Sequence, residues 1–274
     1  MDNVTPSALH SRRLIRWVAA FTGIVLGAYL ALTPGGLLAK ADMVGYAVCH
    51  RIPSHSFFVG GRQLPLCARC SGTFLGALTG LFGQAVVLKR RRDSGLPPIP
   101  IVILLVAFIG IMGADGLNSY LTLIPGAPYL YEPQQWLRII TGSLNGLTLS
   151  ALIYPIFNLS FWRRPAPTPA VRNLRDVGIL LLLEAAMVTL VMIGWTPLLF
   201  PLAVLSALGV LTMLTFVNTV LVMMATGWEN RYQSLREAAP PLLLGFSLAL
   251  LQVGAIDVLR YLATGTLNGF PGLS

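Results

Sequence analysis

The sequence predicts an all-α membrane protein, folded as a polytopic bundle of about seven transmembrane helices. Hydrophobic residues make up 55% of its 274 residues and charged residues only 11%, whereas soluble domains carry about 25% charge. The mean hydropathy is +0.74. The apolar residues form long runs, and a helix of about 20 such residues crosses the hydrocarbon core of a bilayer. Together these observations exclude a soluble globular protein.

Each expected span is one apolar run, and short polar segments separate the runs. The spans are expected at residues 17–38, 71–88, 99–114, 137–159, 177–200, 201–226 and 241–262. A break is expected in the first run, at Thr33-Pro34-Gly35-Gly36, because proline and glycine interrupt helices. The chain then divides into a cytoplasmic N-terminal tail (1–16), a membrane domain (17–160) with spans one to four and a Cys/His loop at 39–70, and a C-terminal membrane region (161–274) with spans five to seven.

The orientation follows from the positive charges, because cytoplasmic loops are enriched in lysine and arginine. Most of the 19 lysine and arginine residues fall in the tail and in the segments 89–92, 163–175 and 231–236. Placing these segments inside gives an N-in, C-out protein of the cell membrane, with the Cys/His loop on the extracytoplasmic side. The net charge of +9 is then explained by orientation signals and by contacts with anionic lipids of the bilayer. No nucleic-acid partner is expected.

The reactive side chains are concentrated in the Cys/His loop. All three cysteines of the chain and two of its three histidines lie between residues 49 and 70. Cys67 and Cys70 have the spacing with which paired thiolates bind one metal ion, and Cys49-His50 forms a second pair upstream. Zinc accepts mixed sulfur and nitrogen ligands without redox chemistry. The sequence therefore predicts a zinc site formed by Cys49, His50, Cys67 and Cys70.

Other interpretations of this loop stay open. Cys49 and His50 are adjacent, so both can bind one metal only from an irregular backbone, and His55 or Asp115 could supply the fourth ligand instead. A site with only three protein ligands would be catalytic. Alternatively, the Cys-x-x-Cys pair could exchange disulfides with Cys49 as the resolving thiol, since an oxidising compartment favours disulfides. A third possibility is a structural disulfide with one idle thiol.

Arginines in the extracytoplasmic segments suggest a site for an anion. Arg51, Arg62, Arg69 and Arg138 run against the positive-inside bias and lie near the expected metal ligands. Guanidinium groups pair bidentately with carboxylate and phosphate oxygens. We expect these arginines, together with Gln63, to bind an anionic lipid or a phosphate-bearing substrate. The simpler alternative is that they anchor lipid head groups and cap helices.

Several acidic residues within or near the spans need partners. Asp115 ends the third expected span, and a carboxylate at such depth is a functional candidate unless it is paired. It is expected to act as a base, to bind the metal, or only to form a salt bridge with Arg138. Glu184, in the middle of the fifth span, is either a proton-coupling carboxyl or a neutral, hydrogen-bonded one. Asp257 and Arg260, three residues apart in the last span, are expected to pair.

The loop and the spans that follow it resemble a family of prokaryotic integral membrane proteins known only as domain of unknown function 2085. The resemblance covers about residues 41–149 and depends on positions in the loop and in the third and fourth spans. These positions are Cys49-His50-Arg51, Pro53-Ser54, Ser56-Phe57, Gly61, Gln63, Pro65, Cys67, Arg69-Cys70, Gly72, Asp115-Gly116, Arg138, Thr141-Gly142 and Gly146. The resemblance implies one shared site that joins the cysteine loop to these two spans, and it implies no particular activity.

The sequence thus predicts a membrane protein with an outward-facing metal site beside a pocket of arginine and aspartate. The first functional hypothesis is a metal-assisted enzyme or transporter for an anionic lipid or phosphate-bearing substrate, with Asp115 and Arg138 as catalytic residues. One alternative is a membrane thiol–disulfide oxidoreductase that uses Cys67 and Cys70. The other is a non-catalytic protein in which the metal staples a partner-binding loop.

Overall fold

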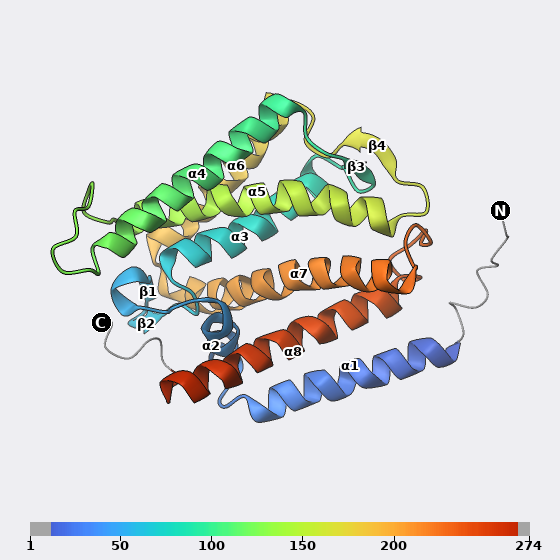
Figure 1. Cartoon of the computed structure of the whole chain (residues 1–274), viewed down its shortest axis with the longest axis horizontal. Coiled ribbons are helices and arrows are strands. Elements are labelled where there is room, and N and C mark those ends of the chain that lie inside the picture. The colour runs from blue at the N-terminus through green and yellow to red at the C-terminus, as the bar shows by residue number, and fades with distance from the viewer. Residues whose placement is uncertain (1–11, 268–274) are drawn as a thin grey trace.

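The computed structural model describes residues 12–267 and is built almost entirely from helices (Figure 1). The helices are α1 (Arg12–Leu32), α2 (Leu37–Val48), α3 (Ala68–Phe82), α4 (Ile99–Leu121), α5 (Gln135–Phe161), α6 (Leu174–Ile193), α7 (Leu199–Thr226) and α8 (Ala239–Thr264). Four short strands accompany them, β1 (Phe58–Val59), β2 (Arg62–Gln63), β3 (Asp93–Gly95) and β4 (Ala166–Pro169). Within residues 12–267, all the helices except α2 are long and apolar enough to cross a membrane, which gives 7 candidate spans. The predicted all-α bundle of about seven spans is confirmed.

The first predicted span is broken where the sequence has proline and glycine. α1 ends at Leu32, Gly35 takes a positive φ of 72°, and the chain restarts as the 12-residue helix α2. α2 therefore fills the first part of the predicted Cys/His loop. Of the predicted tail, residues 1–11 lie outside the described residues, and α1 includes the rest.

The bundle is packed most closely between α3 and α5. A Cβ atom added to Gly142 would lie 2.2 Å from the carbonyl oxygen of Arg69, and one added to Gly146 would lie 2.1 Å from that of Thr73. Only glycine lets the two backbones touch at these positions, as in other membrane-helix interfaces built on small residues. This contact fixes the start of α3 against the start of α5, where most of the predicted site residues lie.

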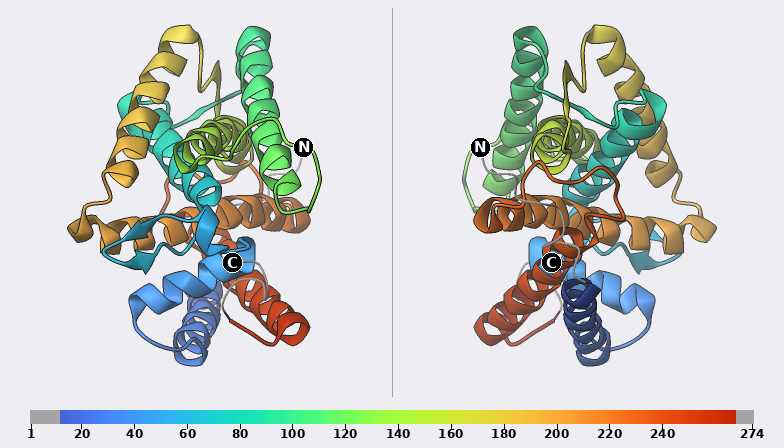
Figure 2. Two further views of the ribbon diagram at one scale, coloured as in Figure 1. Left: turned by 90° about the vertical axis from the view of Figure 1, so that its left-hand side faces the viewer. Right: turned by 90° about the vertical axis from the view of Figure 1, so that its right-hand side faces the viewer.

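The helices α1, α2, α7 and α8 form the other part of the bundle (Figure 2). α8 packs against α1 and α7, and α2 packs against α7 and α8. α7 also contacts α3 and α5, so it joins the two parts. Through these contacts the C-terminal end of α2 meets the start of α3, with Cys49 and Cys67 in one buried cluster together with Val210 of α7 and Val253 of α8.

The two ends of the bundle differ in character (Figure 1). One end carries α2 and the antiparallel hairpin of β1 and β2, whose turn residues Gly60 and Gly61 have positive φ. The other end carries the parallel pair of β3 and β4, where Asp93 forms a 2.9 Å ion pair with Arg172. The basic segments 89–92 and 163–175 adjoin these strands. The Cys/His loop and the basic segments therefore lie at opposite ends.

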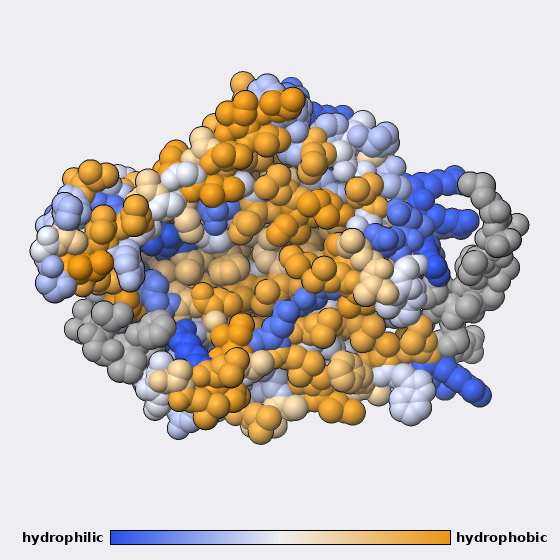
Figure 3. Space-filling model, viewed as in Figure 1, coloured by the Kyte–Doolittle hydropathy of each residue, from blue (hydrophilic) through white to orange (hydrophobic). Residues whose placement is uncertain are grey.

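Apolar side chains cover the flank of the bundle between these ends (Figure 3). The exposed large hydrophobic residues include Ile103 and Val106 of α4 and Leu182 of α6. Such an apolar surface is stable in contact with lipid tails and would aggregate in water. The distribution of surface residues agrees with a bundle that crosses the membrane along its helix axes.

Candidate metal centre

The three cysteines of the chain converge at the junction of α2 and α3. Cys49 follows the last residue of α2, Cys67 precedes the first residue of α3, and Cys70 lies in the first turn of α3. Their Sγ atoms all lie within 4.8 Å of one another. Cys49 and Cys67 are buried, and Cys70 is partly buried. The group can therefore offer three sulfur ligands to one ion.

Backbone N–H groups point at two of the sulfur atoms. The amides of Cys67 and Arg51 donate to Cys49 Sγ at 3.2 Å and 3.5 Å, and the amide of Cys70 donates to Cys67 Sγ at 3.5 Å. Arg51 reaches this geometry with a positive φ of 53°, which is uncommon for a non-glycine residue. Such donors stabilise negative charge on sulfur and are used to tune metal–thiolate sites. The backbone is thus arranged to stabilise negative charge on Cys49 and Cys67.

The three thiol groups also shift one another's pKa through hydrogen bonds. Hydrogen bonds from the Cys67 and Cys70 thiols hold the pKa of Cys49 well below its ordinary value, although burial opposes this effect. The hydrogen bond to Cys49 raises the pKa of Cys67 to about 12. Of these two, Cys49 therefore loses its proton first and Cys67 keeps its own. A bound cation would replace the thiol protons and stabilise all the thiolates together.

His50, the fourth predicted ligand, lies beside the cysteine group but is not a member of it. Its Nδ1 accepts a hydrogen bond of 3.0 Å from the amide of Ile52, so in this tautomer Nε2 carries the proton. Burial lowers the pKa of His50 and lowers that of His55 to about 4. Their rings meet edge to face with centroids 5.4 Å apart. The structure therefore brings together three of the four predicted ligands, with a pair of neutral imidazoles next to them.

A residue that the sequence did not suggest for the site, Arg260 of α8, supports the cysteine loop. Its guanidinium donates to the carbonyl oxygens of Tyr46 and Cys49 and, at 3.4 Å, to that of His50. It also lies over the ring of Tyr46, 4.1 Å from the centroid. A cation at the C-terminal end of α2 is favoured by the helix dipole. Arg260 thus fixes the backbone that carries Cys49 from a helix far away in the sequence.

Two of the predicted anion-binding arginines already have a partner. Asp42 of α2 forms ion pairs of 3.0 Å with Arg51 and 2.7 Å with Arg62. Gln63, predicted to bind the same substrate, donates to the carbonyl of Arg51 and to Ser56 Oγ. These contacts hold the hairpin of β1 and β2 against α2. The three predicted substrate-binding residues therefore have structural partners here.

The predicted residues Arg69 and Asp115 form the centre of a second polar cluster. Arg69 donates to Asp115 Oδ2 through Nη2 and, at 3.1 Å, through Nε. Tyr131 donates to Oδ1 at 2.9 Å, and Thr141 donates to Oδ2 at 3.2 Å. Asp115 is only 2% exposed. Of the roles expected for Asp115, the structure shows a salt bridge, and its partner is Arg69 and not Arg138.

Arg138 has no such partner. It is 4% exposed, yet no ion pair to a carboxylate reaches it within residues 12–267. Its guanidinium makes only two long hydrogen bonds of 3.4 Å, to Ser119 Oγ and to the carbonyl of Ser54. A buried cation without a counter-charge is costly. Among the four predicted anion-binding arginines, Arg138 is therefore the one without an ion pair in the described part of the chain.

Comparison with known proteins relates this site to a family. Residues 49–152 match the family described as "Predicted membrane protein (DUF2085)". This part of the chain is similar to that family. An uncharacterized protein of Methanocaldococcus jannaschii is 34% identical over 110 residues, which are 40% of this chain and 64% of that protein. An uncharacterized protein of Methanothermobacter thermautotrophicus is 29% identical over 85 residues, 30% of this chain and 76% of that protein.

The DUF2085 match delimits the shared part of the molecule. It confirms the resemblance seen in the motifs, and it includes the three cysteines, Asp115 and Arg138. It ends within α5, so α6, α7 and α8, with Arg260, lie outside it. The chain spans slightly less than two thirds of the Methanocaldococcus relative, 64% of its length. No solved structure matches this fold.

The pairing of Arg69 with Asp115 leads to a stability prediction. Replacing Arg69 with methionine leaves the buried Asp115 carboxylate without its cation, which costs about 3–5 kcal/mol of unfolding free energy. The double variant Arg69→Met/Asp115→Asn removes both charges and should recover most of this loss. Thermal unfolding in detergent measures both. A double variant as unstable as the single one would contradict the assigned pair.

Proposed function

We propose that this protein holds one zinc ion on Cys49, Cys67 and Cys70, and that the fourth coordination position faces a site for an anionic group. The observation that carries the proposal is the convergence of the three Sγ atoms to within 4.8 Å of one another. Thiolate ligands select soft or borderline metals such as zinc. Zinc sites with three protein ligands keep an open position for water or substrate.

The charges around the cysteines support a metal with an open position. Zinc and three thiolates together carry a net charge of about −1. Arg69, Arg138 and Arg260 all act electrostatically on His50, which adjoins the site. These cations are close enough to offset a negative metal–thiolate group and an arriving anion. His50 would then serve as a neutral neighbour of the open position, and it becomes a ligand only if its ring gives up the bond to Ile52.

Arg138 is the residue that we propose for substrate binding. It is buried, it lacks a carboxylate partner among the described residues, and its electrostatic neighbours include Cys67 and Asp115. A phosphate group offers the oxygen pair that a guanidinium binds best. The proposed substrate is therefore a phosphate-bearing lipid or free phosphate. A metal-assisted reaction and transport would both begin with this binding step.

A thiol–disulfide oxidoreductase is the second candidate, because the same contact among three thiols suits disulfide exchange. The lowered pKa of Cys49 makes it the attacking group in that case. An exchange enzyme needs its sulfur atoms free, whereas a zinc site keeps them bound. Metal content and thiol state therefore separate the two functions.

The first prediction from the proposal concerns metal content. Protein purified in detergent without chelators should contain about one zinc per chain by elemental mass spectrometry. Cys49→Ser, Cys67→Ser and Cys70→Ser should each lose most of it, because two sulfur ligands do not complete the site. Ser94→Ala, at the opposite end of the bundle, is the control and should retain zinc.

The opposite outcome supports the oxidoreductase. Alkylation without reductant would then trap a disulfide between two of the cysteines in the wild-type protein, and zinc would be absent from every variant. That result would contradict the metal site.

A second prediction concerns the anion. Arg138→Gln should leave the zinc content unchanged but weaken binding of inorganic phosphate by about tenfold or more, since it removes a charge-assisted bidentate contact. Arg62→Gln is the matched control, because Arg62 is paired with Asp42 and should not change phosphate binding. Phosphorus NMR titration of the wild-type protein and both variants provides the measurement. Equal affinity in all three would remove Arg138 from the site.

We also propose that the metal site faces the extracytoplasmic side of the cell membrane, which is supported by the basic segments at the other end of the bundle. Leu130 and Gln233 are exposed. Leu130 lies in the segment between α4 and α5, whose end at Gln135 contacts Ser54 of the Cys/His loop, and Gln233 lies between α7 and α8 and contacts Arg92 of a basic segment. An impermeant maleimide applied to intact cells should label Leu130→Cys and spare Gln233→Cys until the cells are lysed. Labelling in the reverse order would place the site in the cytoplasm.

A further inference from the structure

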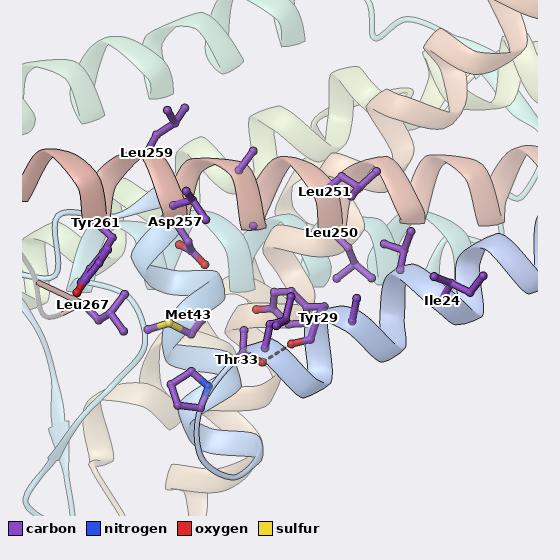
Figure 4. A pocket seen from close by; sticks show the side chains of 17 residues that line it. Ile24, Tyr29, Thr33, Met43, Leu250, Leu251, Asp257, Leu259, Tyr261 and Leu267 are labelled. Carbon is purple, nitrogen blue, oxygen red and sulfur yellow. Dashed lines mark hydrogen bonds between the residues drawn. The ribbon is translucent and has the colours of Figure 1, made fainter. Parts of the chain in front are cut away.

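A large apolar cavity lies between α1 and α8 (Figure 4), and its lining does not include the cysteines or Arg138. Its volume is about 860 Å³, within the range of about 300–1,000 Å³ that is usual for small-molecule sites. Ile24 and Tyr29 of α1, Leu250 and Leu251 of α8 and Met43 of α2 are among its lining residues. α1 is mostly uncovered, with 17% of its apolar window buried. Lipid-soluble molecules can therefore reach the cavity from the bilayer.

The apolar lining of the cavity contains one acidic side chain, Asp257. Asp257 of α8 is only 8% exposed and points toward the space between α8, Tyr29 and Met43 (Figure 4). Its Oδ1 is buried without a hydrogen-bond partner, and no hydrogen bond or ion pair to Asp257 is formed within the described part of the chain. Arg260, its expected partner, acts on Asp257 electrostatically but makes no direct ion pair with it, because the Arg260 guanidinium donates to the carbonyls of Tyr46 and Cys49.

The neighbouring polar groups do not satisfy this carboxyl. The hydroxyl of Tyr29 donates to the carbonyl of Lys40 at 3.3 Å, and the hydroxyl of Thr33 donates to the carbonyl of Tyr29. A buried polar group without a partner is destabilising, and an ionisable group within a membrane is rarely left unpaired. Acyl chains of the surrounding lipid could fill the cavity but have no donor for Asp257. A ligand that suits both the cavity and Asp257 therefore needs an apolar chain and a hydrogen-bond donor at one end.

We propose that this cavity binds a single-chain membrane amphiphile whose head group, an amine or a hydroxyl, donates a hydrogen bond to Asp257. The chain lies along α1 and α8 among Ile24, Leu250 and Leu251, and the head group lies at the end near Met43. An anionic head group is excluded, because it would place like charge against the carboxyl. This site is independent of the zinc and phosphate site, since it uses none of the same residues.

A larger side chain at Gly254 would fill the cavity without disturbing the fold. Gly254 lines the cavity, and a Cβ atom added to it meets no other atom within 4 Å. Gly254→Leu should therefore occupy the space where the chain of the ligand lies. Gly110 of α4 also has open space around it and does not line the cavity, so Gly110→Leu is the matched control.

The experiment uses the full chain reconstituted in phosphatidylcholine vesicles with photoreactive octadecylamine, octadecanol or octadecyl sulfate. Cross-linked peptides are mapped by mass spectrometry. The amine and the alcohol should label peptides of α1 and α8 at least about tenfold more than the sulfate, the order expected for a hydrogen bond to a charged group. Asp257→Asn should abolish the preference for the amine, and Gly254→Leu should reduce labelling by both donors while Gly110→Leu does not.

Two results would overturn the proposal. Equal labelling by all three head groups in the wild-type protein would mean that the cavity holds only acyl chains of bulk lipid. Unchanged labelling in Gly254→Leu would mean that the probes bind elsewhere. The comparison of head groups needs only the wild-type protein, so it decides the proposal even if a variant fails to fold.

Discussion

The backbone contact between α3 and α5 is the constraint on which the site depends. Gly142 and Gly146 of α5 let this helix touch the backbone of α3 at Arg69 and Thr73, near the start of α3. This contact fixes the direction in which the side chains at the start of α3 point. Cys67 and Cys70 then face Cys49, while Arg69 faces Asp115. The same turn of α3 therefore positions Cys67 and Cys70 as well as the buried ion pair of Arg69 with Asp115, and a shift of that turn would disturb both.

Other parts of the molecule supply the remaining residues of the site, which the first turn of α3 does not contain. α2 brings Cys49 and Asp42, and α8 brings Arg260, which binds the backbone around Cys49. The site is thus assembled from residues 49–152, which match the family model, and from helices outside this segment. Most polar side chains of these clusters are hydrogen-bonded within the described residues. Exceptions include Arg138, which makes only long hydrogen bonds, and Asp257 and Glu184, which have buried carboxyl oxygens without a partner. For Arg138 and Asp257 we propose ligands of complementary chemistry.

Composition and spacing predicted a large part of this structure. The spans follow from apolar length, the break after Leu32 follows from Pro34 and Gly35, and the spacing of the cysteines indicated a common site. The partners of the charged residues were not predictable, because they depend on contacts between helices. Asp42 and Arg260 carry no motif, and Asp115 had two arginines within reach of its end of the bundle. Only the packing of α3 against α5 decides that Arg69 is its partner.

The most direct test of the account is X-ray absorption at the zinc edge on the purified, detergent-solubilised protein. A zinc ion held by the three cysteines would show three sulfur neighbours at about 2.3 Å and one lighter nitrogen or oxygen neighbour, as in open zinc–thiolate sites. Added phosphate should alter the light neighbour and leave the sulfur count unchanged. A spectrum with only nitrogen and oxygen neighbours would contradict the account, because the three cysteines would then not be the ligands.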